Sequence, residues 1–543
     1  GIRDIDRSRG LGDVYKRQEK NLEEMVSQFE IEDRACGIIM NAKTGAVLAM
    51  ATAPGFDLNN PSDVADIQIA QSAQDMGLLD IDKNEVIKED KAASLLASLT
   101  EEQYNDAYVD AREQQWKNKA ITELYIPGSV FKVITSSAAL EENLITLNDT
   151  FNCSGSVTVV EGTSPIHCWK TSGHGSQSFV EAITNSCNPA FIEIGRRLGS
   201  EKFFDYFKAY GLTERTGIDL PAEATSYYQG VEGMGPVELA SCSFGQTNKV
   251  TPLEMITAYA AVINGGNLVT PYVVNKIVDN DGNVVMTKEK TIKRQVISEE
   301  TSELMCQTLE TVALSNGAYI KGYHVGGKSG TSEKLDDYAG DEEDPMRYVA
   351  SYCCFAPADD PEVIMLIMAD EPMSGEYYGS QIAVPYSRKV MEEILPYLGY
   401  YPEYSEEEVR NMDVTIPFVE DMTINDAKQA LDAKGLTYQI VGDGETVCGQ
   451  MPLSGSVVSQ GGTVILYTQK NYTQENVEVP DLTGYSLSDA SYLITSAGLT
   501  FVASGASTDS SSSVVQSQSV EAGNIVPKGT VIELTFGVND QSG

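Results

Sequence analysis

The sequence predicts an α+β protein with one large domain followed by two small modules. Strand-like apolar segments lie at both ends of the first region, at 36–51 and 348–369, whereas the segment between them is largely helical in pattern. Strands from distant parts of a chain often complete one sheet, which is typical of α+β domains. Towards the C-terminus, one strand–helix–strand pattern occurs twice. A chain of 543 residues is also too long for a single hydrophobic core.

Four segments follow from this pattern. Residues 1–18 hold five Lys and Arg residues without a helical or strand period, and their last part, DVYKRQ, resembles translated sequencing-adapter sequence. We therefore expect a non-native leader there. The large domain is expected over 19–402, with an acidic, partly helical and solvated insertion at 62–115. The two modules are expected at 411–470 and 475–538.

The charge balance excludes some classes of partner. Asp and Glu number 79 against 38 Lys and Arg, which gives a formal net charge of −41. Nucleic acid and anionic membrane surfaces repel such a protein, so we expect neither as a partner. No apolar run reaches the roughly 18 residues that a membrane helix needs.

The two modules are internal repeats. Pro417 pairs with Pro480, and Gly435 pairs with Gly498, at a common offset of 63 residues. Each glycine is suited to stop a helix, and the residues suited to cap that helix are Thr423 or Asn425 in the first copy and Ser486 or Ser488 in the second. The pattern resembles the PASTA repeat, a wall-associated module of bacterial transpeptidases and kinases.

The segment YIPGSVFKVITSSA places Ser129 and Lys132 about one helical turn apart, directly after a Pro-Gly pair. A serine hydroxyl is a weak nucleophile until a base removes its proton. Lysine can be that base only where burial and nearby positive charge favour its neutral amine. The surrounding apolar residues would supply such burial: Val130, Phe131, Val133 and Ile134. Alone, the Ser-x-x-Lys pattern is weak evidence, because it often occurs by chance.

Two further motifs make the pattern specific. Ser-Cys-Asn at 186–188 offers a hydroxyl and an amide next to a proline, which suits a loop that projects polar groups into a cleft. Lys-Ser-Gly-Thr at 328–331 combines a cation with a glycine that lets a substrate backbone lie along a strand. The first residues of the three motifs are separated by 57 and then 142 residues.

The order of the three motifs resembles that of the penicillin-binding transpeptidases and serine β-lactamases. Four flanking segments are similar to class B penicillin-binding proteins of the septum and sporulation type: 43–61, 118–132, 174–191 and 244–266. The resemblance implies a transpeptidase fold of the serine β-lactamase kind, with a central antiparallel sheet flanked by helices and two small α+β PASTA modules. One departure is Thr247, where relatives commonly carry glycine.

The resemblance implies a serine-type D-Ala-D-Ala transpeptidase, which cross-links peptidoglycan stem peptides through an acyl-enzyme on Ser129 and binds penicillin covalently. Lys132 would be the general base of acylation. Ser186 would relay a proton between Lys132 and the leaving amine.

The resemblance also assigns substrate contacts. Asn188 would hold the substrate amide, and Lys328 would bind the terminal carboxylate of a D-Ala-D-Ala stem and help to keep the base neutral. Ser329, Gly330 and Thr331 would complete the substrate-binding strand. The backbone N–H groups of Ser129 and Thr331 would form the oxyanion hole.

The same resemblance implies no cofactor, stem peptides and β-lactams as ligands, and a separate glycosyltransferase of the division or spore machinery as a partner. It further implies a single N-terminal membrane anchor, missing from this chain, and an extracellular catalytic domain. It leaves open whether the role is vegetative septation or sporulation, and what the PASTA modules bind.

Three other functions remain to be weighed. A serine β-lactamase would use the same motifs, but such enzymes are compact single domains without repeats. A wall-binding scaffold with an inactive catalytic domain is disfavoured because all motif residues are present. A Ser-His-Asp hydrolase is disfavoured because no Gly-x-Ser-x-Gly elbow frames any serine.

The nine cysteines are an odd number, so at least one thiol is free. Cys153 and Cys168 flank a short strand-like stretch, and a disulfide between them is a hypothesis that competes with free thiols. Together with His167 and His174 they could suggest zinc, but the spacing lacks a Cys-x2-Cys knuckle. We therefore expect no metal.

Overall fold

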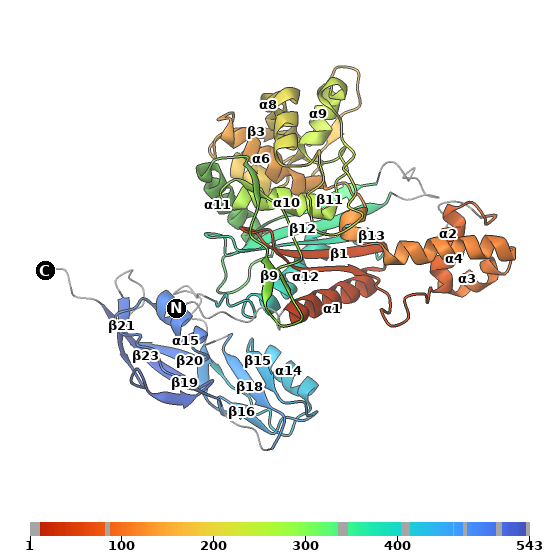
Figure 1. Ribbon diagram of the computed structural model, residues 1–543. Coiled ribbons are helices and arrows are strands. Elements are labelled where there is room, and N and C mark those ends of the chain that lie inside the picture. The colour runs from red at the N-terminus through yellow and green to blue at the C-terminus, as the bar shows by residue number, and fades with distance from the viewer. Residues whose placement is uncertain are drawn as a thin grey trace. The chain divides into compact units, whose positions relative to one another are not determined.

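The computed structural model describes residues 11–81, 87–334, 346–402, 413–459, 461–470, 475–505 and 513–538. These residues divide into two compact units (Figure 1). The large unit comprises the residues up to 319 together with 324–393, and the repeat unit comprises 320–323 and the residues from 394 onward. Each unit has hydrophobic clusters of its own.

A five-stranded antiparallel sheet forms the centre of the large unit. Its strand order is β11-β12-β13-β1-β2, so two strands from the N-terminal part lie beside three from the C-terminal part. The bounds are β1 Ile31–Asn41, β2 Val47–Ala53, β11 Gly326–Glu333, β12 Tyr348–Ala356 and β13 Val363–Pro372. The expected central antiparallel sheet is confirmed. Every residue of β13 is buried, because helices lie on both faces of the sheet (Figure 1).

One face of the sheet is covered by α1 (Leu11–Phe29), which packs on β1 and β2. Helix α12 (Gly379–Ile394) lies beside α1 (Figure 1). Tyr386 Oη donates a hydrogen bond of 2.8 Å to Gln28 Oε1 between these two helices. Segments near the start and the end of the large unit therefore close the same face.

Residues 11–18 correct the prediction that 1–18 carries no helical period. They form the first half of α1, and the side chains of Val14 and Gln18 are fully buried. Gln18 lies so close to β1 that a Cβ on Gly37 would be 2.7 Å from its Nε2. The buried residues continue at helical spacing to Leu22, but the basic residues between them obscured this period in the sequence. Residues 1–10 lie outside the described part of the chain.

The opposite face of the sheet carries a helical layer centred on α10 (Pro252–Ile263). All residues of α10 are buried, as expected for a helix that is apolar on all sides. It packs on β1 and β13 and against α6 (Lys132–Glu141) and α11 (Glu299–Ser315). Beyond α6 lies α8 (Asn188–Ala209), and the layer is completed by α5 (Lys119–Thr122), η1 (Gly128–Phe131), α7 (Phe179–Thr184), η2 (Val231–Gly233) and α9 (Pro236–Ser243).

The described residues of the large unit also form four short two-stranded antiparallel sheets. They pair β3 (Thr150–Cys153) with β6 (Gly175–Ser178), β4 (Ser156–Val157) with β5 (Ile166–His167), β7 (Asn267–Val269) with β10 (Ile292–Gln295), and β8 (Lys276–Val278) with β9 (Val284–Thr287).

The acidic segment predicted at 62–115 corresponds to α2 (Asp66–Asp75), α3 (Glu89–Leu96) and α4 (Glu101–Trp116), the last of which extends one residue beyond it. These helices enclose a small hydrophobic cluster of their own, which includes Ile69, Ala92 and Ala107. The segment is therefore a helical subdomain with a packed interior, where the sequence indicated only a solvated insertion.

Buried charges are paired at one end of the sheet. Arg34 is 3% exposed and contacts both Glu123 and Asp370, the latter at 3.3 Å. Lys334 Nζ lies 3.2 Å from the second Asp370 oxygen and 2.5 Å from Glu371. Burial raises the pKa of Asp370 to about 6. Such a cluster is stable only while every carboxylate keeps its cation.

The repeat unit contains two copies of one topology. The first has β14 (Asp413–Thr415), α14 (Ile424–Asp432), β15 (Thr437–Val441), β16 (Gly449–Met451), β17 (Val457–Ser459) and β18 (Thr463–Tyr467). The second has β19 (Asn476–Glu478), α15 (Leu487–Ser496), β20 (Thr500–Gly505), β21 (Ser513–Gln518), β22 (Ile525–Pro527) and β23 (Val531–Val538). Their three-stranded sheets, β15-β18-β16 and β20-β23-β21, share the same order.

In each repeat, the helix is capped by one of the two residues that the sequence suggested. Thr423 accepts a hydrogen bond from the Asp426 N–H, and Ser486 accepts the equivalent bond in the second copy. Gly435 and Gly498 follow the helices with φ of 67° and 75°, which only glycine adopts at little cost. In the described part of the chain, no helix combines the length and apolar character that a bilayer crossing requires.

Candidate active site

Ser129 lies on a tight turn that precedes α6. The turn is the 3-10 helix η1, and its first residue, Gly128, has a φ of 54° and donates from its N–H to Gly245 O at 2.9 Å. A Cβ on Gly128 would lie 2.8 Å from Thr331 O. A glycine is therefore required for the turn to approach β11, and this approach fixes the position of Ser129.

Lys132 is the first residue of α6 and is fully buried. Its Nζ lies 2.9 Å from Ser129 Oγ. The rings of Phe191 and Phe244 lie 5.4 and 6.0 Å from this nitrogen. The apolar surroundings of Lys132 thus include residues from α8 and from the end of α9, and not only the neighbours in sequence that were predicted to bury it.

The turn between α7 and α8 supplies the other oxygens around Lys132. Lys132 Nζ lies 2.8 Å from Ser186 O, 3.0 Å from Ser186 Oγ and 2.8 Å from Asn188 Oδ1. Ser186 has a φ of 51°, which is uncommon for a residue with a side chain. The Asn188 amide nitrogen donates to His167 O at 3.1 Å. Both polar atoms of Asn188 are therefore engaged within the protein in this structure.

Lys328 is also fully buried and extends from β11 towards the same turn. Its Nζ lies 3.2 Å from Ser186 Oγ and donates to Ser329 O at 2.9 Å. Burial lowers the pKa of Lys328 to about 7. Burial also lowers the pKa of Lys132 well below its usual value, and the charge of Lys328 lowers it further.

This arrangement suits a neutral amine at Lys132. Ser186 O and Asn188 Oδ1 can only accept hydrogen bonds, so they take up two N–H groups of the amine. The remaining direction faces the hydroxyl groups of Ser129 and Ser186. A neutral amine has a lone pair in that direction and can remove a proton from an attacking hydroxyl.

Strand β11 carries Ser329, Gly330 and Thr331 at the edge of the central sheet. Ser329 and Thr331 are partly exposed, and the Thr331 hydroxyl accepts a hydrogen bond of 3.0 Å from Gly379 N. A Cβ on Gly330 would lie within 2.9 Å of Pro127 O, Val130 Cγ2 and Ser351 Oγ. Glycine at 330 therefore permits close packing of β11 against the turn that carries Ser129. This reason differs from the predicted one, which was to leave room for a substrate backbone.

Two glycines that contribute to this geometry were missed in the sequence, 245 and 379, whereas Gly128 was expected as part of a Pro-Gly turn. A Cβ on Gly245 would lie 2.1 Å from Gly128 O. No local pattern indicates this contact, because it joins segments more than a hundred residues apart. The departure at Thr247 is accommodated by a hydrogen bond of 2.6 Å between its hydroxyl and that of Ser241.

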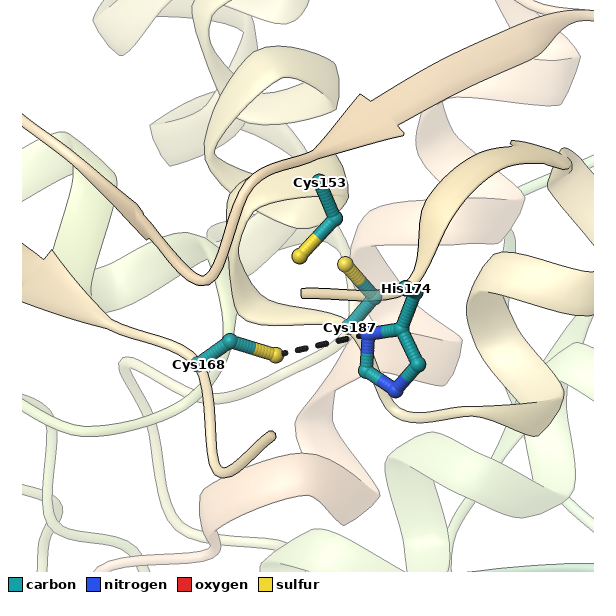
Figure 2. A group of neighbouring side chains, drawn as sticks. All are labelled: Cys153, Cys168, His174 and Cys187. Atoms are coloured by element: carbon teal, nitrogen blue, oxygen red, sulfur yellow. Dashed lines mark hydrogen bonds between the residues drawn. The ribbon is translucent and has the colours of Figure 1, made fainter. Parts of the chain in front are cut away.

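The predicted cysteine pair lies in a larger cluster. Cys153, Cys168, Cys187 and His174 place one ligand atom each within 4.8 Å of one another (Figure 2). Cys187 was not part of the prediction, and His167 is not part of the cluster. His174 Nδ1 lies 3.6 Å from Cys168 Sγ.

Comparison with known proteins identifies both units. Residues 35–392 match the penicillin binding protein transpeptidase domain, and residues 414–470 and 477–538 match the PASTA domain. Stage V sporulation protein D of Bacillus subtilis is 37% identical over 369 residues, 66% of this chain. The peptidoglycan D,D-transpeptidase FtsI homolog of Mesostigma viride is 28% identical over 57% of it. The chain spans about half of both relatives, 56% of each.

Solved structures show the same fold. The transpeptidase domain of penicillin-binding protein 3 from Burkholderia pseudomallei superimposes with a TM-score of 0.54 at 21% identity, over 73% of this chain and 97% of that one. A peptidoglycan synthetase from Bifidobacterium adolescentis gives 0.56 at 19% identity, over 73% and 62%. From the motifs, the fold and the match over 35–392, the chain belongs to the penicillin-binding protein transpeptidase family.

Proposed function

We propose that this chain is a serine D,D-transpeptidase that cross-links the stem peptides of peptidoglycan and is acylated by β-lactams. One observation carries the proposal. The buried Lys132 amine lies within 3.0 Å of the hydroxyl groups of Ser129 and Ser186, and Lys328 lies within 3.2 Å of the second of these. The groups proposed as nucleophile, base, relay and carboxylate-binding cation thus lie within hydrogen-bond distance of their neighbours without any rearrangement.

In the proposed acylation, Ser129 Oγ attacks the carbonyl carbon of the penultimate D-alanine while its proton moves to Lys132 Nζ. The proton then passes through Ser186 to the amine of the leaving D-alanine, which completes the break of the peptide bond. The backbone N–H groups of Ser129 and Thr331 stabilise the oxyanion. Lys328 binds the substrate carboxylate.

In the proposed second step, an amine of a neighbouring stem peptide attacks the ester on Ser129. Lys132 takes a proton from that amine and passes it to Ser129 Oγ, which leaves as the restored hydroxyl, so that Lys132 is neutral again. Because Asn188 is engaged with Lys132 and His167, it contacts the substrate amide only after one of these bonds is exchanged. The product is a cross-link between two glycan strands.

The setting of this activity is part of the proposal. A relative named Stage V sporulation protein D supports a role in sporulation, and the proposal includes a separate glycosyltransferase as the partner. The catalytic domain would lie outside the cell, held by a single N-terminal membrane anchor. The PASTA modules would hold the transpeptidase near the wall.

Covalent labelling by a fluorescent penicillin tests the proposal. The expected result is a label that persists for hours on the wild-type chain and is absent from Ser129→Ala. Fast loss of the label would indicate a β-lactamase, and a wild-type chain that takes up no label would indicate an inactive scaffold. Ser154→Ala, which changes an exposed serine, is the matched control and should label normally.

A further inference from the structure

The cluster beside the candidate active site has the composition of a metal site. Three sulfurs and one imidazole nitrogen meet there, and the side chains of Cys153, Cys168 and Cys187 are at most 2% exposed. Three thiolates and one histidine are a common ligand set of structural zinc. We propose that Cys153, Cys168, His174 and Cys187 bind one Zn²⁺ ion in tetrahedral geometry.

The distances fit this ion. With Zn–S of about 2.3 Å and Zn–N of about 2.0 Å, tetrahedral angles place a sulfur and a nitrogen about 3.5 Å apart and two sulfurs about 3.8 Å apart. Cys168 Sγ and His174 Nδ1 are 3.6 Å apart, and all four ligand atoms lie within 4.8 Å of one another. In Figure 2, Nδ1 of His174 faces Cys168.

The backbone is shaped to bring these ligands together. Gly155 and Gly173, which follow Cys153 and precede His174, have φ of 98° and 80°. A Cβ on Gly155 would lie 2.0 Å from Thr171 O, and one on Gly173 would lie 2.4 Å from Cys153 O. The two loops therefore need glycine to approach each other, as in a closed ligand pocket.

Two of the sulfurs also have backbone N–H groups as partners, and such groups can donate to a thiolate, the form of cysteine that binds metals. The backbone N–H groups of Lys170 and Asn188 hydrogen-bond to the Cys168 sulfur, and that of Ala190 to the Cys187 sulfur. Cys187 is the N-cap of α8, and the N-terminal end of a helix stabilises negative charge. Such outer contacts orient the ligands of metal sites.

Two competing interpretations are less complete. A disulfide would use only two of the three cysteines and leave the histidine without a role. The second group of candidate ligands, Asp33, Asp370 and Glu371, already contacts the cations Arg34 and Lys334. Those carboxylates are therefore already paired within the protein.

Metal analysis of the full chain, purified with reductant and without chelator, tests the proposal. About one zinc per chain is expected. In Cys187→Ser and His174→Ala, zinc affinity measured against a chromogenic chelator should fall at least about tenfold. Cys306→Ser is the matched control, because Cys306 is also buried, at 6% exposed, and its thiol donates to the backbone carbonyl of Ile263. It should retain the wild-type zinc content.

A second measurement does not depend on the stability of the variants. Replacement of zinc by Co²⁺ in the wild-type chain should give the visible bands of tetrahedral, thiolate-bound cobalt. A metal-free chain with two cysteines that resist alkylation until reduced would overturn the proposal in favour of a disulfide. A metal-free chain with every thiol alkylated, or zinc retained by both ligand variants, would overturn it as well.

Discussion

Replacing Lys328 with Gln tests whether a buried positive charge keeps Lys132 available as a base. Burial and then the charge of Lys328 lower the pKa of Lys132. Gln removes the charge but keeps a group that can donate to the Ser186 hydroxyl. The pKa of Lys132 should therefore rise in the variant, because its ammonium form no longer faces a second cation.

The size of this effect follows from the distances. Ser186 Oγ lies 3.0 Å from Lys132 Nζ and 3.2 Å from Lys328 Nζ, so the two nitrogens are at most about 6 Å apart. At an effective dielectric constant of about 20, two unit charges at this separation repel by about 3 kcal/mol. One pKa unit corresponds to about 1.4 kcal/mol. The pKa of Lys132 is therefore expected to rise by about 2 units.

The assay is the rate constant of acylation by a fluorescent penicillin, measured over a pH series. The acid limb of the profile, where Lys132 carries a proton, should move to higher pH by about 2 units. Lys328→Arg is the matched control, because its guanidinium stays charged and should leave the limb at or below the wild-type position. A lower rate with an unmoved limb would refute the electrostatic argument, since the loss would then come from substrate binding alone.

Three further changes test the close packing at Gly330, the buried ion pairs of Arg34 and the helix cap at Thr423. Gly330→Ala is expected to lower the acylation rate roughly 100-fold, because the added Cβ would displace the turn that carries the nucleophile. Gly230→Ala is the control and should leave the acylation rate unchanged, because a Cβ there would meet nothing within 4 Å. In chemical denaturation, Arg34→Met should lower the free energy of unfolding by about 3–5 kcal/mol, because it leaves buried carboxylates without their cation. Lys43→Met, at a more exposed ion pair, should lower it by at most about 1 kcal/mol. Equal losses in those two variants would contradict the role given to burial. Thr423→Ala should cost the repeat unit about 1 kcal/mol in the same measurement, through the lost helix cap.

The elements that depend on local chemistry were predictable from the sequence. The one-turn spacing of Ser129 and Lys132 places them on one face of a helix, and the structure has them 2.9 Å apart. Apolar strands at both ends of the large unit pair in one sheet, as their patterns indicated. The glycines that stop the two repeat helices have positive φ, as the same position in both copies suggested.

Contacts between distant segments were not predictable in this way. Phe244 lies close to Lys132 only because the chain folds back on itself, and nothing in the sequence around Phe244 indicates this contact. The zinc interpretation was rejected because the sequence lacks a Cys-x2-Cys pair. The four ligand atoms nevertheless converge, because β3, two loops and the start of α8 meet at one point. Metal ligands in the interior of a large domain need no short spacing.

The proposed zinc site would also account for the strained turn next to it. A residue such as Ser186, with a side chain and a φ of 51°, costs on the order of 1–3 kcal/mol and persists only where its neighbours hold it. Two residues after Ser186, Asn188 is bound to Lys132. Between Ser186 and Asn188, Cys187 would be fixed by the metal. The two anchors together would keep the Ser186 hydroxyl between the two lysine amines, which is where a proton relay has to be.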